Sequence, residues 1–203
     1  MSWHFTPFAA PLFVGAALML GIALIALRRR PARGGTSLVF LSLAITVYVL
    51  AYAFELGSAT QAGVELWLRV EYLGAANVPG LLLLVVLAYT GRERVVTPLR
   101  VALLFVVPAI TCLLAWSNPS HQLIWGGITT DRQAGFTWTR FRPGPWYWVH
   151  NAYIYMLLAT AIVLLARARA RASGLIRRQM NVLLAGTLVP LVVHLLYLTG
   201  LFF

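Results

Sequence analysis

Four side chains stand out because they are polar and ionisable yet lie within apolar stretches of the sequence. Glu55 closes one apolar run, Glu71 lies inside the next, and His150 and His194 lie in two later runs. A carboxyl group within a bilayer is costly, and it needs a proton, a cation or a hydrogen-bond donor as its partner. Two carboxyl groups at a similar depth therefore favour a pocket that binds a cation, an amine or protons.

The stretch around Glu71 holds acids, a base and an amide together. Glu65 and Arg69 are four residues apart with the acid first, which is the favourable order for an ion pair on a helix. Trp67 and Glu71 share another face of the same helix, and Asn77 lies deeper, near the middle of the membrane. The rest of this stretch is Leu, Val and Ala, so the expected helix is polar at one end and apolar at the other.

A second polar stripe lies on a later helix. Trp146, His150 and Tyr153 follow one another at helical spacing, and Asn151 is next to the histidine. An imidazole is costly against lipid, so this stripe is expected to face protein or a cavity. The residues that we expect to line a ligand pocket are Glu55, Trp67, Arg69, Glu71, Tyr72, Asn77, Trp146, His150, Asn151, Tyr153 and His194.

The elements that must position these residues are six apolar runs, each near the roughly 20 residues that a membrane span needs. The chain is 61% hydrophobic and 10% charged, whereas soluble domains carry about 25% charged residues. We therefore predict an all-α membrane protein: a single transmembrane domain over residues 1–203, built as a six-helix bundle. The predicted helices cover residues 8–27, 36–56, 63–89, 99–116, 146–166 and 179–200.

The connection at residues 117–145 is expected to cover the outer end of the bundle. It alternates aromatic, β-branched and polar residues on both sides of the letters QAG, which is typical of a β-hairpin. Pro79, Pro108 and Pro190 lie within three different predicted helices and are expected to kink them.

The arginines predict the orientation of the bundle. All 16 basic residues are arginines, and 12 of them follow the first, third and fifth helices. The positive-inside rule places those connections in the cytosol, and both termini and the polar end of the third helix outside. No basic segment precedes the first apolar run, so that run is interpreted as a membrane helix rather than a cleaved signal peptide. The net charge of +11 thus reflects topology, and no nucleic-acid partner is expected.

Several classes of chemistry are disfavoured. The sequence contains no lysine, which excludes a retinal Schiff base. Cys112 is the single cysteine, so no intrachain disulfide or C-x-x-C pair exists. The hydrolase motifs H-E-x-x-H and G-x-S-x-G are missing. His150 and His194 as paired metal or haem ligands lack a tight ligand motif, so we expect no enzyme activity, cofactor or metal.

Five stretches, in their order along the chain, resemble the N-terminal seven-helix sensor region of bacterial histidine kinases, a module that also precedes diguanylate cyclase domains. They are AFELGS, ELWLRVEYLGAANVPGLLLLVVLAYTG, NPSHQLIW, PGPWYWVHNAYIY and RRQMNVLLAGTLVPLVVHLLYLTG. The resemblance implies a sensor in the bacterial inner membrane that relays a signal to a cytosolic kinase or cyclase output domain, and it suggests a homodimer. The family has a seventh helix, whereas this chain ends after the sixth, so a sensor portion without its transmitter is expected.

The resemblance also assigns individual positions. Glu55 corresponds to the acidic residue that closes the second helix, whereas His194 stands where the family more often has Asn. The third helix is matched by Trp67, Arg69, Glu71, Tyr72 and Pro79. The start of the outer loop is matched by Asn118, Pro119, His121 and Trp125. The entry to the fifth helix is matched by Trp146, Trp148, His150, Tyr153 and Tyr155. The last helix is matched by Arg178, Gln179, Pro190 and Tyr197.

Three functions remain open on these grounds, the weakest of which is a pure assembly module that passes no chemical signal. The first is a sensory receptor module that binds an unknown small molecule or ion in the outer half of the bundle. The second is a small secondary transporter or proton-coupled permease, which the carboxyl groups and prolines would also suit. The apolar inner halves of the helices disfavour the transporter, because a translocation path needs polar lining on both sides of the midplane.

Overall fold

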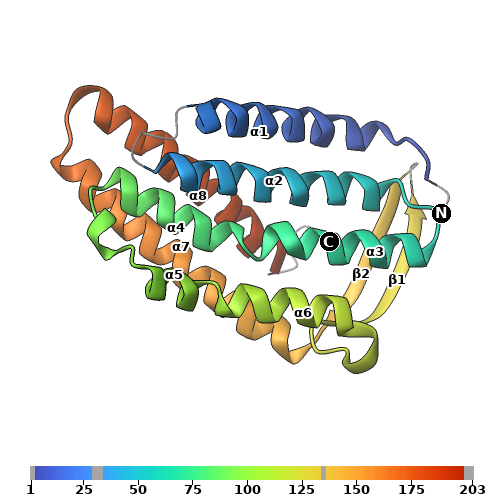
Figure 1. The fold of residues 1–203 in the computed structure, drawn as a ribbon. Coiled ribbons are helices and arrows are strands. Elements are labelled where there is room, and N and C mark those ends of the chain that lie inside the picture. The colour runs from blue at the N-terminus through green and yellow to red at the C-terminus, as the bar shows by residue number, and fades with distance from the viewer. Residues whose placement is uncertain (1–2, 29–33, 134–135, 199–203) are drawn as a thin grey trace.

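The computed structural model describes residues 3–28, 34–133 and 136–198, and it is mostly helical (Figure 1). Within these described residues, five segments are long and apolar enough to cross a membrane: Pro7–Arg28, Gly35–Leu56, Gln61–Tyr89, Pro98–His121 and Pro145–Arg171. The predicted multi-pass helical architecture is confirmed at this level. The count of six spans stays a prediction, because the last helix is not among the five.

The helices and strands are bounded as follows. The chain forms η1 (Pro7–Ala9), α1 (Ala10–Arg28), α2 (Gly35–Leu56), α3 (Gln61–Ala75), α4 (Val78–Tyr89), η2 (Glu93–Val95), α5 (Pro98–Leu104), α6 (Val106–His121), β1 (Trp125–Gln133), β2 (Phe136–Pro143), α7 (Pro145–Arg171) and α8 (Gly174–Leu198).

The outer surface of the bundle is apolar. Leu113 on α6 is 71% exposed, and Val14 and Leu18 on α1 are also largely exposed. In water such side chains would form large apolar patches, which soluble monomers rarely tolerate. In a bilayer they meet hydrocarbon, so the exposure supports a membrane location.

The third predicted helix, residues 63–89, is two helices in the structure. Pro79 has no backbone N–H and cannot bond the carbonyl four residues earlier, so α3 ends at Ala75 and α4 starts at Val78. Asn77 lies at the break, where its backbone N–H donates to Gly74 O at 3.0 Å. Hydropathy predicts one span here because no charged residue marks the break.

The fourth predicted helix, residues 99–116, is likewise divided and is longer than expected. The chain breaks at Phe105, between α5 and α6, three residues before Pro108. The second part continues to His121 and ends where Gln122 takes a left-handed conformation, at a φ of 52°. The polar sequence SNPSH predicts a loop from residue 117, whereas in the structure these residues form the last turns of α6. By contrast, α8 is one helix through the position of Pro190.

Helix α7 also extends beyond its predicted end at residue 166, as far as Arg171. Arginine and alanine are good helix formers, so the helix continues after its apolar, membrane-compatible part is over.

An apolar cluster holds α4, α7 and α8 together toward the arginine-rich end of the bundle. Its buried members are Leu83, Val86, Leu157, Ala161, Leu165 and Met180. At the opposite end α2 packs against α1 and α3. The bundle thus has a dry half around this apolar cluster and a half toward the strands that holds the buried polar side chains of Glu55, Glu71 and His150.

Strands β1 and β2 pair in antiparallel fashion, so the predicted hairpin segment is a two-stranded sheet. Buried Asn118 fixes its start, because Oδ1 accepts the N–H groups of Ile124 and Trp125 and Nδ2 donates to Trp125 O. Thr137 Oγ1 donates to Ser58 O at 2.8 Å, which ties β2 to the turn between α2 and α3. The sheet crosses the end of the bundle opposite the α4–α5 and α7–α8 connections (Figure 1).

Candidate functional site

The two carboxyl groups predicted to share a depth lie against each other. Glu55, at the last turn of α2, is 4% exposed, and Glu71, on α3, is 8% exposed. Their side chains interact, and Tyr48 lies within electrostatic range of both. No hydrogen bond from the described residues reaches Oε1 of Glu71. The described ion pairs include neither carboxyl group, so the pair needs a proton or a cation from elsewhere.

Close packing of α2 and α3 brings the two acids together. At Gly74 an added Cβ atom would lie 2.4 Å from Ala44 O and 2.6 Å from Tyr48 N. Since these are backbone atoms, only glycine permits the two helices to approach this closely.

Arg69 and Trp67, on the same helix, face other partners. Arg69 forms an ion pair with Glu65 at 3.5 Å, as the spacing predicted, with both side chains partly exposed. Its Nε is nevertheless buried and has no hydrogen-bond partner among the described residues. Trp67 stacks on Phe54 of α2 with ring centroids 4.6 Å apart, and Phe54 also contacts Trp3. Trp67 therefore belongs to an aromatic cluster near the N-terminus.

A second buried polar group joins α6 to α7 around Thr111, which is fully buried. The Thr111 hydroxyl lies 2.8 Å from Val107 O, 3.2 Å from Nδ1 of His150 and 2.9 Å from Nε1 of Trp146. The indole N–H can only donate. If the hydroxyl proton goes to the carbonyl of Val107, His150 carries its proton on Nδ1 and leaves Nε2 as an acceptor.

Tyr72 lies between the carboxyl pair and the His150 group. Its ring centroid is 5.3 Å from that of Trp125 and 6.3 Å from that of His150. Its hydroxyl is within electrostatic range of Glu71. Buried Asn151 donates from Nδ2 to Tyr147 O at 2.9 Å. The polar groups of α2, α3, α6 and α7 thus form one buried region beneath the strands.

Tyr153 contacts the backbone at the end of α5. Pro108 cannot donate to Leu104 O, because proline lacks a backbone N–H. The Tyr153 hydroxyl donates to that same carbonyl. The sequence singled out Tyr153 for its helical spacing, and the structure adds this contact at the break between α5 and α6.

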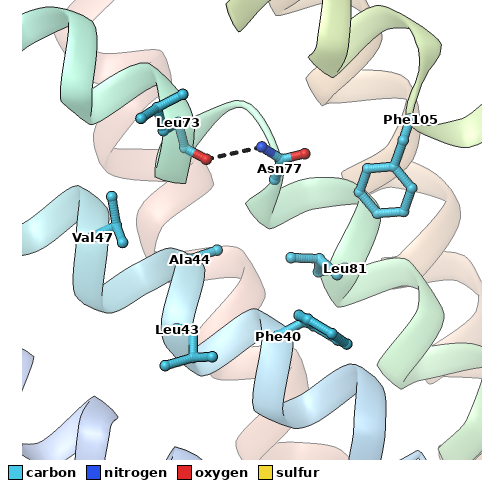
Figure 2. Close-up of a pocket in the computed structure, with 8 residues that line it drawn as sticks. All are labelled: Phe40, Leu43, Ala44, Val47, Leu73, Asn77, Leu81 and Phe105. Carbon is cyan, nitrogen blue, oxygen red and sulfur yellow. Dashed lines mark hydrogen bonds between the residues drawn. The ribbon is translucent and has the colours of Figure 1, made fainter.

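Asn77 lies in a groove on the bundle surface, apart from the carboxyl pair. Its Nδ2 donates to Leu73 O at 2.9 Å, which satisfies a carbonyl at the break between α3 and α4 (Figure 2). The groove has a volume of about 340 Å³. Its other lining residues are Phe40, Leu43, Ala44, Val47, Leu73, Leu81 and Phe105. It is therefore an apolar groove with a single amide at its edge (Figure 2).

The structure leaves one predicted site residue without a side-chain position. His194 lies in α8, but its side chain is outside the described residues, so its expected place in the pocket stays a prediction. Within the described parts of the chain, no group of three or more His, Cys, Asp and Glu side chains is placed to hold a metal ion.

The sequence analysis missed two members of this region, Tyr48 and Thr111. A signal existed for Tyr48, because it lies seven residues before Glu55 and so shares a helical face with it. No signal separated Thr111 from an ordinary membrane-helix threonine, since such residues commonly bond the carbonyl four residues earlier.

The comparison with protein families decides where this fold belongs. The model of the N-terminal 7TM region of histidine kinase matches residues 11–203. The chain belongs to this family. No curated protein and no solved structure matches the chain. This 7TM region is thus a multi-pass sensory module of the histidine kinase type, and a cytosolic output domain is associated with such regions.

Proposed function

We propose that this 7TM region detects a small cation, an amine or protons through the buried pair of Glu55 and Glu71. The single observation that supports this is that two buried carboxyl groups face each other with no cation among their described partners. Two such groups cannot both stay ionised in a medium of low dielectric, so occupancy by a cation or a proton changes the energy of the pair. Tyr48, Tyr72 and His150 supply polar and aromatic groups around it.

The proposed relay runs from the strand-covered end to the arginine-rich end. A ligand shifts a helix arrangement only by its differential affinity for the two states, commonly about 1–3 kcal/mol. Glu55 and Glu71 lie on α2 and α3, and the breaks at Asn77 and Phe105 lie between them and the apolar cluster of α4, α7 and α8. A change in the spacing of α2 and α3 would reach the cytosolic output domain through this cluster.

The proposal includes a topology. We infer that α8 is a sixth span, that the strands face outward, and that the N-terminus lies outside the inner membrane of a bacterium. The mostly apolar sequence of α8 and the gathering of arginines at one end of the bundle support this arrangement. A homodimer is part of the proposal on the ground of family membership alone.

The test is a titration of the full chain in lipid nanodiscs. The pH is lowered from about 8 to 5, and in parallel NaCl and methylamine are added at fixed pH, while tryptophan fluorescence reports rearrangement. We expect at least one of these probes to change the wild-type signal. Glu71→Gln and Glu55→Gln should abolish that change, whereas Glu65→Gln, which removes a partly exposed acid from the same helix, should keep it.

Two results would contradict the proposal. A response in Glu71→Gln equal to that of the wild type would show that the pair is structural. Loss of the response together with an equal loss of thermal stability would also favour a structural role. Uptake of a probe into proteoliposomes that depends on the protein would instead support the transporter.

A further inference from the structure

The arginine-rich end of the bundle contains a small pocket that the proposed function does not use. It has a volume of about 230 Å³ and lies where the end of α4, the end of α7 and the first turns of α8 meet. Arg92 enters it from the turn after α4, and Arg167 and Arg171 enter from the last two turns of α7. Buried Met180 and half-buried Ala168 are also part of its wall.

Three guanidinium groups around one pocket repel one another unless an anion lies between them. Arg167 and Arg171 are four residues apart and so lie on one face of α7. Among the described residues, neither an ion pair nor a side-chain hydrogen bond engages any of the three. Neighbouring Arg169, by contrast, donates to Asn181 Oδ1, and Arg100 donates to Val95 O. The three lining arginines therefore have free N–H donors for a phosphate group. The planar guanidinium group fits a phosphate well, because it can donate two parallel hydrogen bonds.

A second groove adjoins this pocket at Tyr89. It has a volume of about 320 Å³, and Tyr89 lines both cavities. Val182 and Leu183 of α8 give it an apolar wall, and Arg178 and Gln179 lie one turn closer to the pocket. Val182 is 72% exposed, which leaves it open to an acyl chain. A charged pocket beside an apolar groove matches the two parts of a phospholipid better than it matches a free phosphate ion.

We propose that this end of the bundle binds one anionic phospholipid, with its phosphodiester among Arg92, Arg167 and Arg171 and an acyl chain along Val182 and Leu183. A zwitterionic lipid would place its own cationic group beside three arginines, so the site should prefer phosphatidylglycerol to phosphatidylcholine.

Native mass spectrometry of the full chain in a neutral detergent tests the proposal, with phosphatidylglycerol, phosphatidylcholine and inorganic phosphate as separate probes. Arg167→Gln with Arg171→Gln should weaken phosphatidylglycerol binding about tenfold. The matched control, Arg94→Gln with Arg177→Gln, removes two charges from the same end but none from the pocket, and it should weaken binding about twofold or less. Arg167→Lys with Arg171→Lys keeps the charges but loses the planar guanidinium groups, so it should weaken binding less than the glutamine pair does and more than the control pair does.

The acyl groove has its own variant. Val182→Asn should weaken the binding of phosphatidylglycerol and leave that of inorganic phosphate unchanged. Equal weakening by the test and control pairs would overturn the proposal, since it would show a diffuse charge effect. Equal binding of phosphatidylcholine would overturn it as well, and so would binding of phosphate with no preference for the lipid.

Discussion

The hydroxyl group of Thr111 lies within hydrogen-bond distance of three partners at the buried contact between α6 and α7. It is reached by Trp146 Nε1 and His150 Nδ1, and it lies within bonding distance of Val107 O. Removing the hydroxyl leaves the carbonyl with its helical bond but leaves the indole N–H and the imidazole nitrogen without their partner. At this scale, stability depends on single buried donors and acceptors.

Thr111→Val should therefore lower the free energy of unfolding by about 1–2 kcal/mol, the cost of buried polar groups that lose their partner. The matched control is Thr160→Val, because the Thr160 hydroxyl bonds only Met156 O, in an exposed position on α7. The control should change stability by less than about 0.5 kcal/mol. Unfolding in a denaturing detergent measures both variants, and equal effects would show that Thr111 has no special role.

Single residues differ in how far the sequence could predict them. A similar depth for Glu55 and Glu71 was predicted from their places in two apolar runs, and the structure adds that their side chains interact. The Tyr153 contact with Leu104 O could not be predicted, because it joins two helices whose relative position the sequence does not encode in any short pattern. Spacing shows which residues share a face, but it does not show what that face meets.

At the scale of the elements, the close packing of α2 on α3 depends on Gly74, which has no side chain. An added Cβ at Gly74 would meet backbone atoms at 2.4 and 2.6 Å, which cannot move aside without separating the helices. At Gly15, on α1, an added Cβ would meet no atom of another described helix or strand within 4 Å. The two glycines thus form a matched pair within membrane helices.

Gly74→Ala should destabilise the protein by about 1–3 kcal/mol, as expected for overpacking at a tight contact. It should also separate Glu55 from Glu71 and weaken the response to the probe ion. Gly15→Ala should be neutral or slightly stabilising, because alanine is the better helix former. Thermal unfolding in nanodiscs compares the two, and a Gly74→Ala variant as stable as Gly15→Ala would contradict the close approach.

Hydropathy predicted the apolar runs but not their breaks. The split at Asn77 lies within one continuous apolar stretch, and the prolines indicated a kink rather than two separate helices. The strands were predicted from alternation, yet their attachment through Asn118 and Thr137 depends on contacts between distant segments. Local patterns therefore predicted the elements, whereas tertiary contacts set where they end and meet.

At the scale of the whole molecule, charge and polarity divide the bundle into two ends. The strands lie at one end, and the α4–α5 and α7–α8 connections, which have eight of the arginines in or beside them, lie at the other (Figure 1). The carboxyl pair belongs to the strand end, because Ser58, three residues after Glu55, accepts the hydrogen bond from Thr137 of β2. This division was predicted from the arginine distribution, because arginines are enriched in the connections that face the cytosol.

Cysteine labelling tests the direction of insertion in cells, in a Cys112→Ala background. Thr130→Cys, at an exposed position of β1, should react with a membrane-impermeant maleimide added outside. Ser173→Cys, exposed in the turn between α7 and α8, should react only after the membrane is permeabilised. The reverse pattern would place the arginine-rich end outside and contradict the proposed orientation.

The break at Asn77 has a consequence for how relatives of this protein can diverge. Substitutions on α3 alter the polar half without repacking Leu83 and Val86, which lie on α4 beyond the break. Under the proposed function, natural selection can then change the ligand that the 7TM region binds while its inner half stays the same. We expect sequences of homologues to vary more in α3, on the strand side of that break, than in α4, on its other side.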